Sequence, residues 1–173
     1  MGKIEDRAYI PTAAEQKTAA RLMAVQNIYS REILDEKDII LDLDDEHNEG
    51  LVAFYRDVIR NESLASEEDL KKKSPRIKIN RKFLKELTEN VADKLSHIDE
   101  NIDKLENSSS NNKLGVILQS ILRAASYELI YNLDTPTNVI INEYVTVSGF
   151  FLEQKEINYV NALLDKLSKN IRK

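Results

Sequence analysis

The sequence predicts an all-α fold, because apolar residues recur at helical spacing along most of it and turn-forming residues are scarce. The chain has 173 residues with only 4 Gly and 3 Pro, and 32% of its residues are charged. Apolar residues three or four positions apart are typical of amphipathic helices, and no segment reads convincingly as a strand. We therefore expect one compact helical domain over residues 1–173, since a chain of this length can bury a sufficient core.

The first predicted helix covers residues 12–34. The Thr12 hydroxyl can cap its first turn, and Glu15, three residues later, completes a capping box. The residues before it, 1–11, are expected to form a flexible N-terminus. The apolar stripe of this helix consists of Leu22, Val25, Tyr29 and Ile33.

Two further helices are predicted in the middle of the chain, one over residues 48–62 and a long one over residues 80–105 that Asn80 caps. Long charged connectors flank the first of them, an acidic one at 35–49 and another at 63–79. The apolar residues of the two helices are again three or four positions apart: Leu51, Phe54, Tyr55, Val58 and Ile59, then Phe83, Leu87, Val91, Leu95, Ile98, Ile102 and Leu105.

The C-terminal part is predicted to form three more helices, over residues 113–133, from 136 to about 149–152, and over 156–171. The polar segment 107–112 before them has low complexity and is expected to be a solvated loop. Apolar residues are densest in the first of the three, which we therefore predict to be the central helix. Those residues are Leu114, Leu118, Ile121, Leu122, Ala125 and Leu129.

Composition excludes several classes of protein. The sequence has no Cys, so neither a disulfide framework nor a thiolate metal site is expected, and its 2 His cannot form a zinc site alone. The chain begins without the apolar run of a signal peptide, and no apolar stretch approaches the length that spans a bilayer. We expect a cytoplasmic protein without a cofactor, a metal or a membrane contact.

The acidic run that begins at Asp42 superficially resembles the calcium-binding loop of an EF-hand. Such a loop needs Gly at its sixth position and Glu at its twelfth. Counting from Asp42, those positions hold His47 and Ala53, and counting from Asp45, the twelfth holds Arg56. A solvated acidic loop is the better interpretation. The Ser, His and carboxylate residues form no catalytic motif either, so no enzyme is predicted.

The net charge of −5 argues against a general nucleic-acid binder, but the positive charge is concentrated locally. Basic residues between 71 and 82 could bind phosphates, although a solvated charged linker is the simpler interpretation. In the first helix, Lys17 and Arg21 are neighbours on one face, and Tyr29 follows two turns after Arg21. Two cations with an aromatic ring suit single-stranded RNA, although Tyr29 could equally belong to the core.

Two segments of the chain resemble a known family. Residues 24–30, AVQNIYS, are similar to the A-V-Q-A-L-Y-S helix of the NusB family of bacterial transcription antitermination factors. Residues 122–166 resemble, without a gap, the family's L-R, Y-E-L, V-P, I-N-E and F-V-N-G-V-L-D-K segments. The matching residues are Leu122-Arg123, Tyr127-Glu128-Leu129, Pro136, Ile141-Asn142-Glu143 and the segment from Tyr159 to Lys166.

The resemblance implies a compact domain of about six to seven helices in two packed subbundles. It also implies binding to boxA-type RNA in ribosomal RNA leaders, as a heterodimer with NusE, a small-subunit ribosomal protein. That heterodimer joins the RNA polymerase antitermination complex and helps the polymerase resist termination.

The resemblance further assigns an RNA surface to the start and middle of the first helix and to the loop and start of the last one. Family members often carry several Arg before the A-V-Q segment, whereas this chain has only two cations there, which implies weaker and less salt-dependent binding. A lysine at 155, where an acidic residue is usual, offsets part of this. The implied RNA-binding residues are Lys17, Arg21, Tyr29, Phe151, Lys155, Tyr159 and Asn161.

Four polar residues of the resembling region, Arg123, Asn142, Glu143 and Asp165, are interpreted as scaffold. We expect them to lie near one another where the last three helices pack, since paired buried charges hold helices in register. Two alternatives remain open for the function. One is an RNA-guiding module related to the N-terminal domain of ribosomal RNA cytosine methyltransferases, and the other is a protein-interaction module that has lost RNA binding.

Overall fold

The computed structural model describes residues 12–34, 79–105 and 114–172, and within these ranges it consists of six α-helices and no strand. The all-α prediction is therefore confirmed. The predicted helix at 48–62, the N-terminal residues 1–11 and the loop at 107–112 lie outside the described residues, as do both charged connectors apart from Ile79. The helices are α1 (Ala13–Leu34), α4 (Arg81–Asp93), α5 (Leu95–Asp103), α6 (Val116–Tyr131), α7 (Thr137–Ser148) and α8 (Gln154–Ile171).

The predicted caps of α1 and α4 are confirmed. The Thr12 amide donates to the Glu15 carboxylate at 2.8 Å, and the Glu15 amide donates to the Thr12 hydroxyl at 3.2 Å. At the start of α4, the Asn80 side chain accepts from the Phe83 amide at 3.0 Å. A second capping box, between Glu153 and Glu156, begins α8 two residues earlier than predicted. Local side-chain chemistry thus sets where these helices begin.

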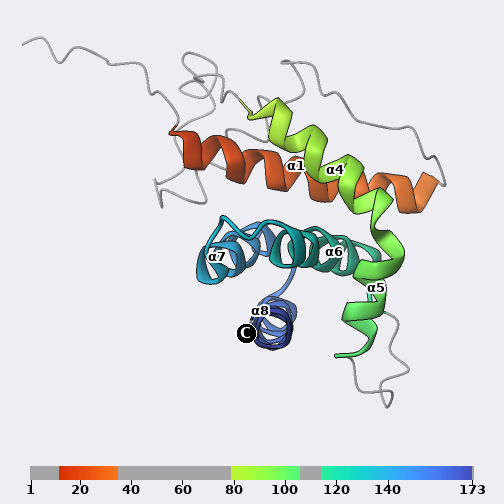
Figure 1. The fold of residues 1–173 in the computed structure, drawn as a ribbon. Helices are drawn as coiled ribbons and strands as arrows, with labels where there is room; N and C mark the ends of the chain where they lie inside the picture. Colours follow the sequence, from red (N-terminus) through yellow and green to blue (C-terminus); the bar gives the residue numbers. More distant parts are fainter. Residues whose placement is uncertain (1–11, 35–78, 106–113, 173) are drawn as a thin grey trace, which may run out of the picture.

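The prediction of one continuous helix over residues 80–105 is wrong, because the chain bends at Lys94. This residue has φ −106° and ψ 11°, and it separates α4 from α5. The bend lets α4 lie along α1 while α5 turns away to pack against α6 (Figure 1). Neither Pro nor Gly marks the position in the sequence, so the apolar spacing continues through it unchanged. Packing against two different helices therefore decides the break.

Helix α6 is the centre of the described structure. It packs against each of the other five described helices, and its apolar side chains, such as Leu122 and Leu129, are fully buried. This confirms the prediction that the segment would be the central helix. In Figure 1, α1 and α4 lie on one side of the layer formed by α6 and α7, and α8 lies on the other. The grouping agrees with two packed subbundles that share α6.

The end of α8 is fastened to the end of α6 by Arg172. Its guanidinium donates to the carbonyl oxygens of Leu129 at 2.8 Å and Asn132 at 2.7 Å, which terminate α6. It also donates to the Thr135 carbonyl at 2.7 Å and the Glu128 carbonyl at 3.1 Å. The last carbonyls of a helix have no intrahelical donor and attract a cation. Arg172, at the end of α8, therefore supplies hydrogen-bond donors to the carbonyl groups at the end of α6.

We expect Arg172→Ala to lower the free energy of unfolding by about 2 kcal/mol, because several carbonyls lose a charged donor. Urea denaturation measures this change. Lys169→Ala is the matched control, since Lys169 is 72% exposed on the same helix, and its removal should change stability by less than about 0.5 kcal/mol. Equal losses for the two variants would contradict the fastening role.

Candidate nucleic-acid interface

The exposed cation of the predicted RNA surface on α1 is Lys17. Its ammonium lies 5.5 Å from the centre of the Phe83 ring, and the Arg21 guanidinium lies 5.1 Å from the same ring. Phe83 is half-buried, so the ring is held between α1 and α4 and supports both cations. Lys17 itself remains exposed to solvent. It is therefore available to a phosphate.

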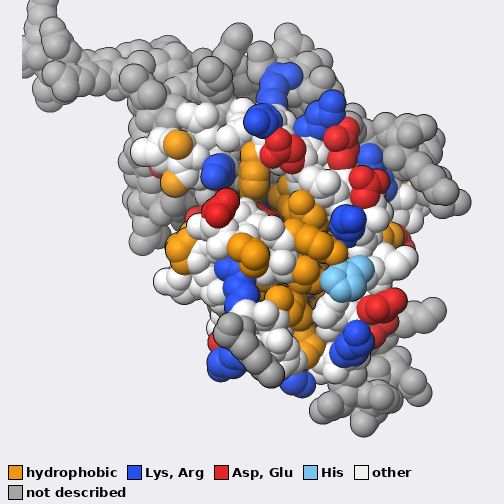
Figure 2. All heavy atoms as spheres, in the orientation of Figure 1, with side chains coloured by type: hydrophobic (Ala, Val, Ile, Leu, Met, Phe, Trp, Pro, Cys, Tyr) orange, Lys and Arg blue, Asp and Glu red, His pale blue; other side chains and the backbone are white. Residues whose placement is uncertain are grey.

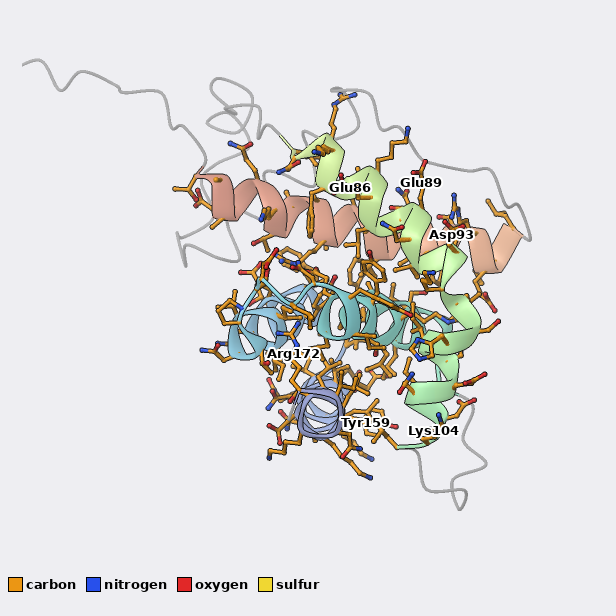
Figure 3. All side chains as sticks on the ribbon, viewed as in Figure 1. Glu86, Glu89, Asp93, Lys104, Tyr159 and Arg172 are labelled. Atoms are coloured by element: carbon orange, nitrogen blue, oxygen red, sulfur yellow. The ribbon has the colours of Figure 1, made fainter. Side chains whose placement is uncertain are left out.

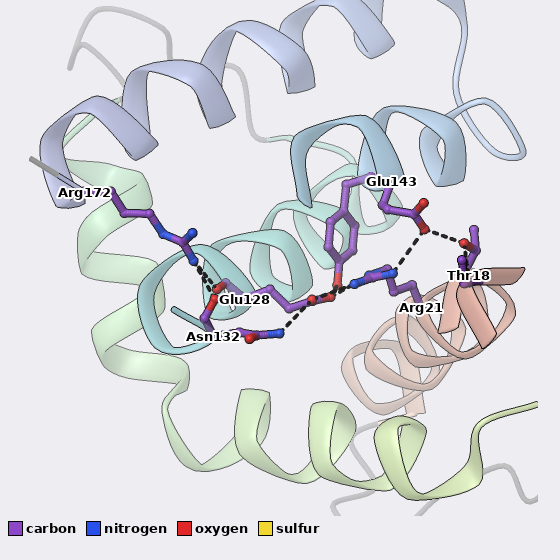
Figure 4. A network of polar contacts seen from close by, with 8 residues as sticks. Thr18, Arg21, Glu128, Asn132, Glu143 and Arg172 are labelled. Atoms are coloured by element: carbon purple, nitrogen blue, oxygen red, sulfur yellow. Dashed lines mark hydrogen bonds and ion pairs between the residues drawn. The ribbon is translucent and has the colours of Figure 1, made fainter. Parts of the chain in front are cut away.

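Arg21, the second predicted phosphate contact, is buried instead. Its side chain is 4% exposed, and its Nε and Nη2 donate to the two carboxylate oxygens of Glu128 at 2.8 and 2.9 Å. Its Nη1 donates to Glu143 at 3.1 Å (Figure 4). A bidentate pair of this kind fixes both side chains in position. The structure thus corrects the prediction for Arg21, which belongs to the scaffold that holds α1 against α6 and α7.

The two carboxylates that face Arg21 have further donors. The Tyr144 hydroxyl donates to Glu128 at 2.7 Å, and the Thr18 hydroxyl donates to Glu143 (Figure 4). Glu128 and Tyr144 are 1% and 0% exposed, so this part of the cluster is shielded from water, whereas the Glu143 side chain is 26% exposed. Buried charges are tolerated when they are paired and hydrogen-bonded in this way. The cluster joins residues of α1, α6 and α7.

The same contacts shift the pKa values of the cluster. Burial by itself lowers the pKa of Arg21, but the hydrogen bond and charge of Glu128, with smaller contributions from Tyr144 and Glu143, raise it above the ordinary value. Arg21 therefore stays charged. Burial, and then the charge of Glu128, raise the pKa of Tyr144 well above its ordinary value. Tyr144 therefore remains a neutral hydrogen-bond donor.

The four predicted scaffold residues do not form one network. Arg123 pairs with Asp99 of α5 through two bonds of 2.9 Å and with Glu32 of α1 at 3.1 Å. Glu143, by contrast, belongs to the Arg21 cluster. The physical reason is that the partners of both residues come from α1 and α5, which lie outside residues 122–166.

The other two predicted scaffold residues, Asn142 and Asp165, are exposed. Asp165 is 53% exposed and pairs at 2.6 Å with Lys169, which lies one turn away on α8. A surface pair of this kind contributes about 0–1 kcal/mol. Asp165 is therefore not the buried scaffold residue that the sequence predicts, and truncating its side chain should change the free energy of unfolding only slightly.

The remaining predicted RNA-binding residues fall into two groups. Tyr29 is 37% exposed on α1, so its ring is accessible and does not belong to the buried core. The second group, in the α7–α8 loop and the first half of α8, consists of half-buried Phe151 and exposed Lys155, Tyr159 and Asn161.

The α7–α8 loop lies between the two groups of predicted RNA-binding residues, Tyr29 on α1 and the residues at the start of α8. Phe150 of this loop packs against Ala19 of α1, so the loop lies beside the N-terminal half of that helix. Tyr159, however, lies on the α8 side of the layer formed by α6 and α7, whereas α1 lies on the other side (Figure 3). The structure therefore brings the loop to α1 and leaves Tyr159 apart.

An aromatic patch on α5 and α6, which we define as His97, Tyr127 and Tyr131, was not singled out as a site from the sequence. The rings of Tyr127 and Tyr131 are 5.2 Å apart, and the Tyr131 hydroxyl lies 2.6 Å from Nδ1 of His97. Figure 2 shows an apolar band that runs down this face beside the histidine. The spacing of Tyr127 and Tyr131, one helical turn apart, could have indicated this patch in the sequence. It was overlooked because the helix that carries them was predicted to be the most buried one.

None of the described helices has the length and apolar character required to cross a membrane. The described residues also contain no group of three or more His, Cys, Asp or Glu placed to hold a metal ion.

We expect Arg21→Ala to lower the free energy of unfolding by about 3–5 kcal/mol, because it leaves two carboxylates without their cation. Chemical denaturation measures the loss. Lys17→Ala, one turn earlier on the same helix, is the control and should cost less than about 1 kcal/mol. A loss below about 1 kcal/mol for Arg21→Ala would show that the ion pair does not hold α1 in place.

Stability should also fall at alkaline pH through Tyr144. Its raised pKa means that the folded state disfavours ionisation, so this contribution is complete below the ordinary tyrosine pKa of about 10 and is lost as pH rises above it. We expect the free energy of unfolding to fall by up to about 1.4 kcal/mol per pH unit in that range. Tyr144→Phe should reduce this slope, and an unchanged slope in urea titrations from pH 9 to 12 would contradict the assignment.

Comparison with known proteins identifies the family of the chain. The sequence model described as "NusB family" matches residues 18–169. Transcription antitermination protein NusB of Rickettsia bellii (strain OSU 85-389) is 32% identical over 154 residues, which cover 88% of this chain and 90% of that protein. The protein of the same name from Rickettsia felis (strain ATCC VR-1525 / URRWXCal2) is 33% identical over 159 residues, with coverages of 91% and 94%.

A solved structure supports the fold. T. maritima NusB superposes with a TM-score of 0.61 at 20% sequence identity, covering 92% of this chain and 93% of that one. The family model spans α4 to α7 completely and most of α1 and α8. The chain belongs to the NusB family.

Proposed function

We propose that this protein is a non-enzymatic transcription antitermination factor of the cytoplasm. In this proposal it binds boxA-type RNA of ribosomal RNA leaders as a heterodimer with the ribosomal protein NusE, and helps RNA polymerase resist termination. The observation that carries the proposal is the family match, which spans residues 18–169. Relatives that are 32–33% identical carry the name transcription antitermination protein NusB.

The geometry supports an RNA surface that is smaller than the sequence implies. Lys17 on α1 and Lys155 on α8 are its exposed predicted cations, because Arg21 is paired inside the protein. Each phosphate that a cation neutralises contributes about 0.7 to the salt slope of single-strand binding. Two such contacts give a slope of about −1.4. Most of the affinity in this proposal then comes from aromatic contacts and from the protein partner.

The accessible rings fit the same proposal. Tyr29 on α1 and Tyr159 on α8 are each partly exposed, at 37% and 38%. Bases of single-stranded RNA stack on such rings at about 1–3 kcal/mol per base. Phe151 and Asn161 complete the group on the α7–α8 loop and α8. The two rings lie on different sides of the layer formed by α6 and α7, and each provides contacts that depend little on salt.

The partner protein in this proposal docks on the aromatic patch of His97, Tyr127 and Tyr131. Aromatic side chains that remain accessible are enriched at protein interfaces. The neighbouring helix α4 exposes the carboxylates Glu86 and Glu89, which complement a basic ribosomal protein. This arrangement leaves α1 free for RNA.

A protein-interaction module without RNA binding is the second candidate function. The burial of Arg21 favours it, because the N-terminal half of α1 then presents a single exposed cation of the predicted set, Lys17. The two candidates differ in one measurable respect, since only the first requires discrimination between RNA sequences.

Fluorescence anisotropy with a labelled boxA-like RNA, with and without NusE, tests the first candidate. Lys17→Ala should weaken binding and reduce the salt slope by about 0.7, because one phosphate contact is lost. Lys169→Ala, an exposed lysine near the far end of α8, is the control and should leave both quantities unchanged. Equal affinity for boxA-like and scrambled RNA in the presence of NusE would reject RNA recognition, and retained NusE binding would then establish the interaction module.

A further inference from the structure

A pocket of about 540 Å³ opens where the second half of α1 meets the bend between α4 and α5. Its walls combine apolar side chains with charged ones, among them Arg123 of α6. The side chains used in the argument below are Ile28, Val91 and Leu95, which are apolar, and Arg31, Glu89 and Asp93, which are charged. A pocket of this size and mixed lining suits a specific ligand group.

Arg31 brings an unused hydrogen-bond donor to the pocket. Its Nε is buried and has no acceptor, and none of the ion pairs between described residues involves its guanidinium. Arg123 is different, because Asp99 and Glu32 occupy its guanidinium. A buried donor without an acceptor is unfavourable. No side chain or carbonyl that lines the pocket accepts a hydrogen bond from Nε of Arg31, so a ligand that supplies an acceptor there would be favoured.

Helix α4 contributes to the pocket two carboxylates whose position near the end of the helix is electrostatically unfavourable. Asp93 is the last residue of α4 and Glu89 lies one turn before it, whereas no basic residue occupies the last turn. Anions near a helix C-terminus oppose the helix dipole. Figure 3 shows Glu86, Glu89 and Asp93 following one another along the helix. Lys85 approaches Glu89 only at 3.8 Å, and both side chains are largely exposed, so neutralisation is weak.

We propose that this pocket binds a basic segment of a partner protein. An arginine or lysine side chain of the segment enters between the carboxylates of Glu89 and Asp93, and its stem packs on Ile28, Val91 and Leu95. A backbone carbonyl of the segment accepts a hydrogen bond from Nε of Arg31. This arrangement provides an acceptor for the unused donor and a closer cation for the weakly neutralised carboxylates.

The charges of the pocket argue against RNA as its ligand. Glu32, Glu89 and Asp93 outnumber Arg31 and Arg123 among the charged residues that line it, and a phosphate would be repelled by this excess. The pocket also lies at the C-terminal end of α1, away from Lys17 near the N-terminal end. The inference therefore does not depend on the proposed RNA surface. It adds a peptide site beside the docking surface proposed for NusE, with which the site shares Glu89.

The test is an amide chemical-shift titration of the full chain with the tripeptide acetyl-Gly-Arg-Gly-amide. Saturable shifts are expected for the amides of Thr88, Val91 and Leu95, with little response to acetyl-Gly-Gln-Gly-amide. Asp93→Asn should weaken binding about tenfold, as expected when a charge-assisted hydrogen bond is lost. Glu100→Gln, an exposed carboxylate on the neighbouring helix α5 that does not line the pocket, is the matched control and should bind normally.

Two further measurements distinguish a binding role of Asp93 from a structural role, and a peptide ligand from a nucleotide. Asp93→Asn should not lower the melting temperature, because it removes an anion from a helix C-terminus; a carboxylate with a purely structural role would give the opposite result. Adenosine monophosphate should not shift the pocket amides. The proposal is overturned if neither tripeptide produces saturable shifts, if both bind equally, or if the nucleotide binds in their place.

Discussion

The ion pair between Arg21 and Glu128 is the contact on which the arrangement of the other helices depends. Both side chains are almost completely buried, so each charge requires the other, and their two parallel hydrogen bonds permit a single relative position of α1 and α6. Tyr144 and Glu143 then attach α7 to the same cluster. The position of Phe83 against Arg21, and with it the support for Lys17, follows from this geometry.

Two other arginines also hold helices together. Arg123 joins α6 to α1 and α5, and Arg172 joins the end of α8 to the end of α6. A guanidinium suits this role because it stays charged and offers five donors in a fixed plane. The consequence for function is direct, since Arg21, the arginine that was predicted to bind a phosphate, is paired inside the fold. The proposed RNA surface therefore relies on lysines and aromatic rings.

The proposed RNA surface and the pocket also differ in the sign of their exposed charges. Exposed lysines at positions 17 and 155 accompany the N-terminal half of α1 and the start of α8, whereas carboxylates gather on the second half of α4. The bend at Lys94 matters here, because it turns α5 away from α1 and helps to open the pocket beside Arg31. A continuous helix would have continued along α1, so one backbone feature contributes both to the packing and to the pocket.

The sequence by itself determined the fold class, the N-terminal caps of α1 and α4, the central position of α6 and the family. These features depend on local spacing and on residues that are close in the chain. The tertiary structure alone decided the bend at Lys94, the burial of Arg21 and the division of the expected polar network into two ion-pair clusters. A cation on an amphipathic helix looks the same in sequence whether it meets water or a carboxylate. Glu128, which buries Arg21, lies more than one hundred positions away, and only folding brings the two together.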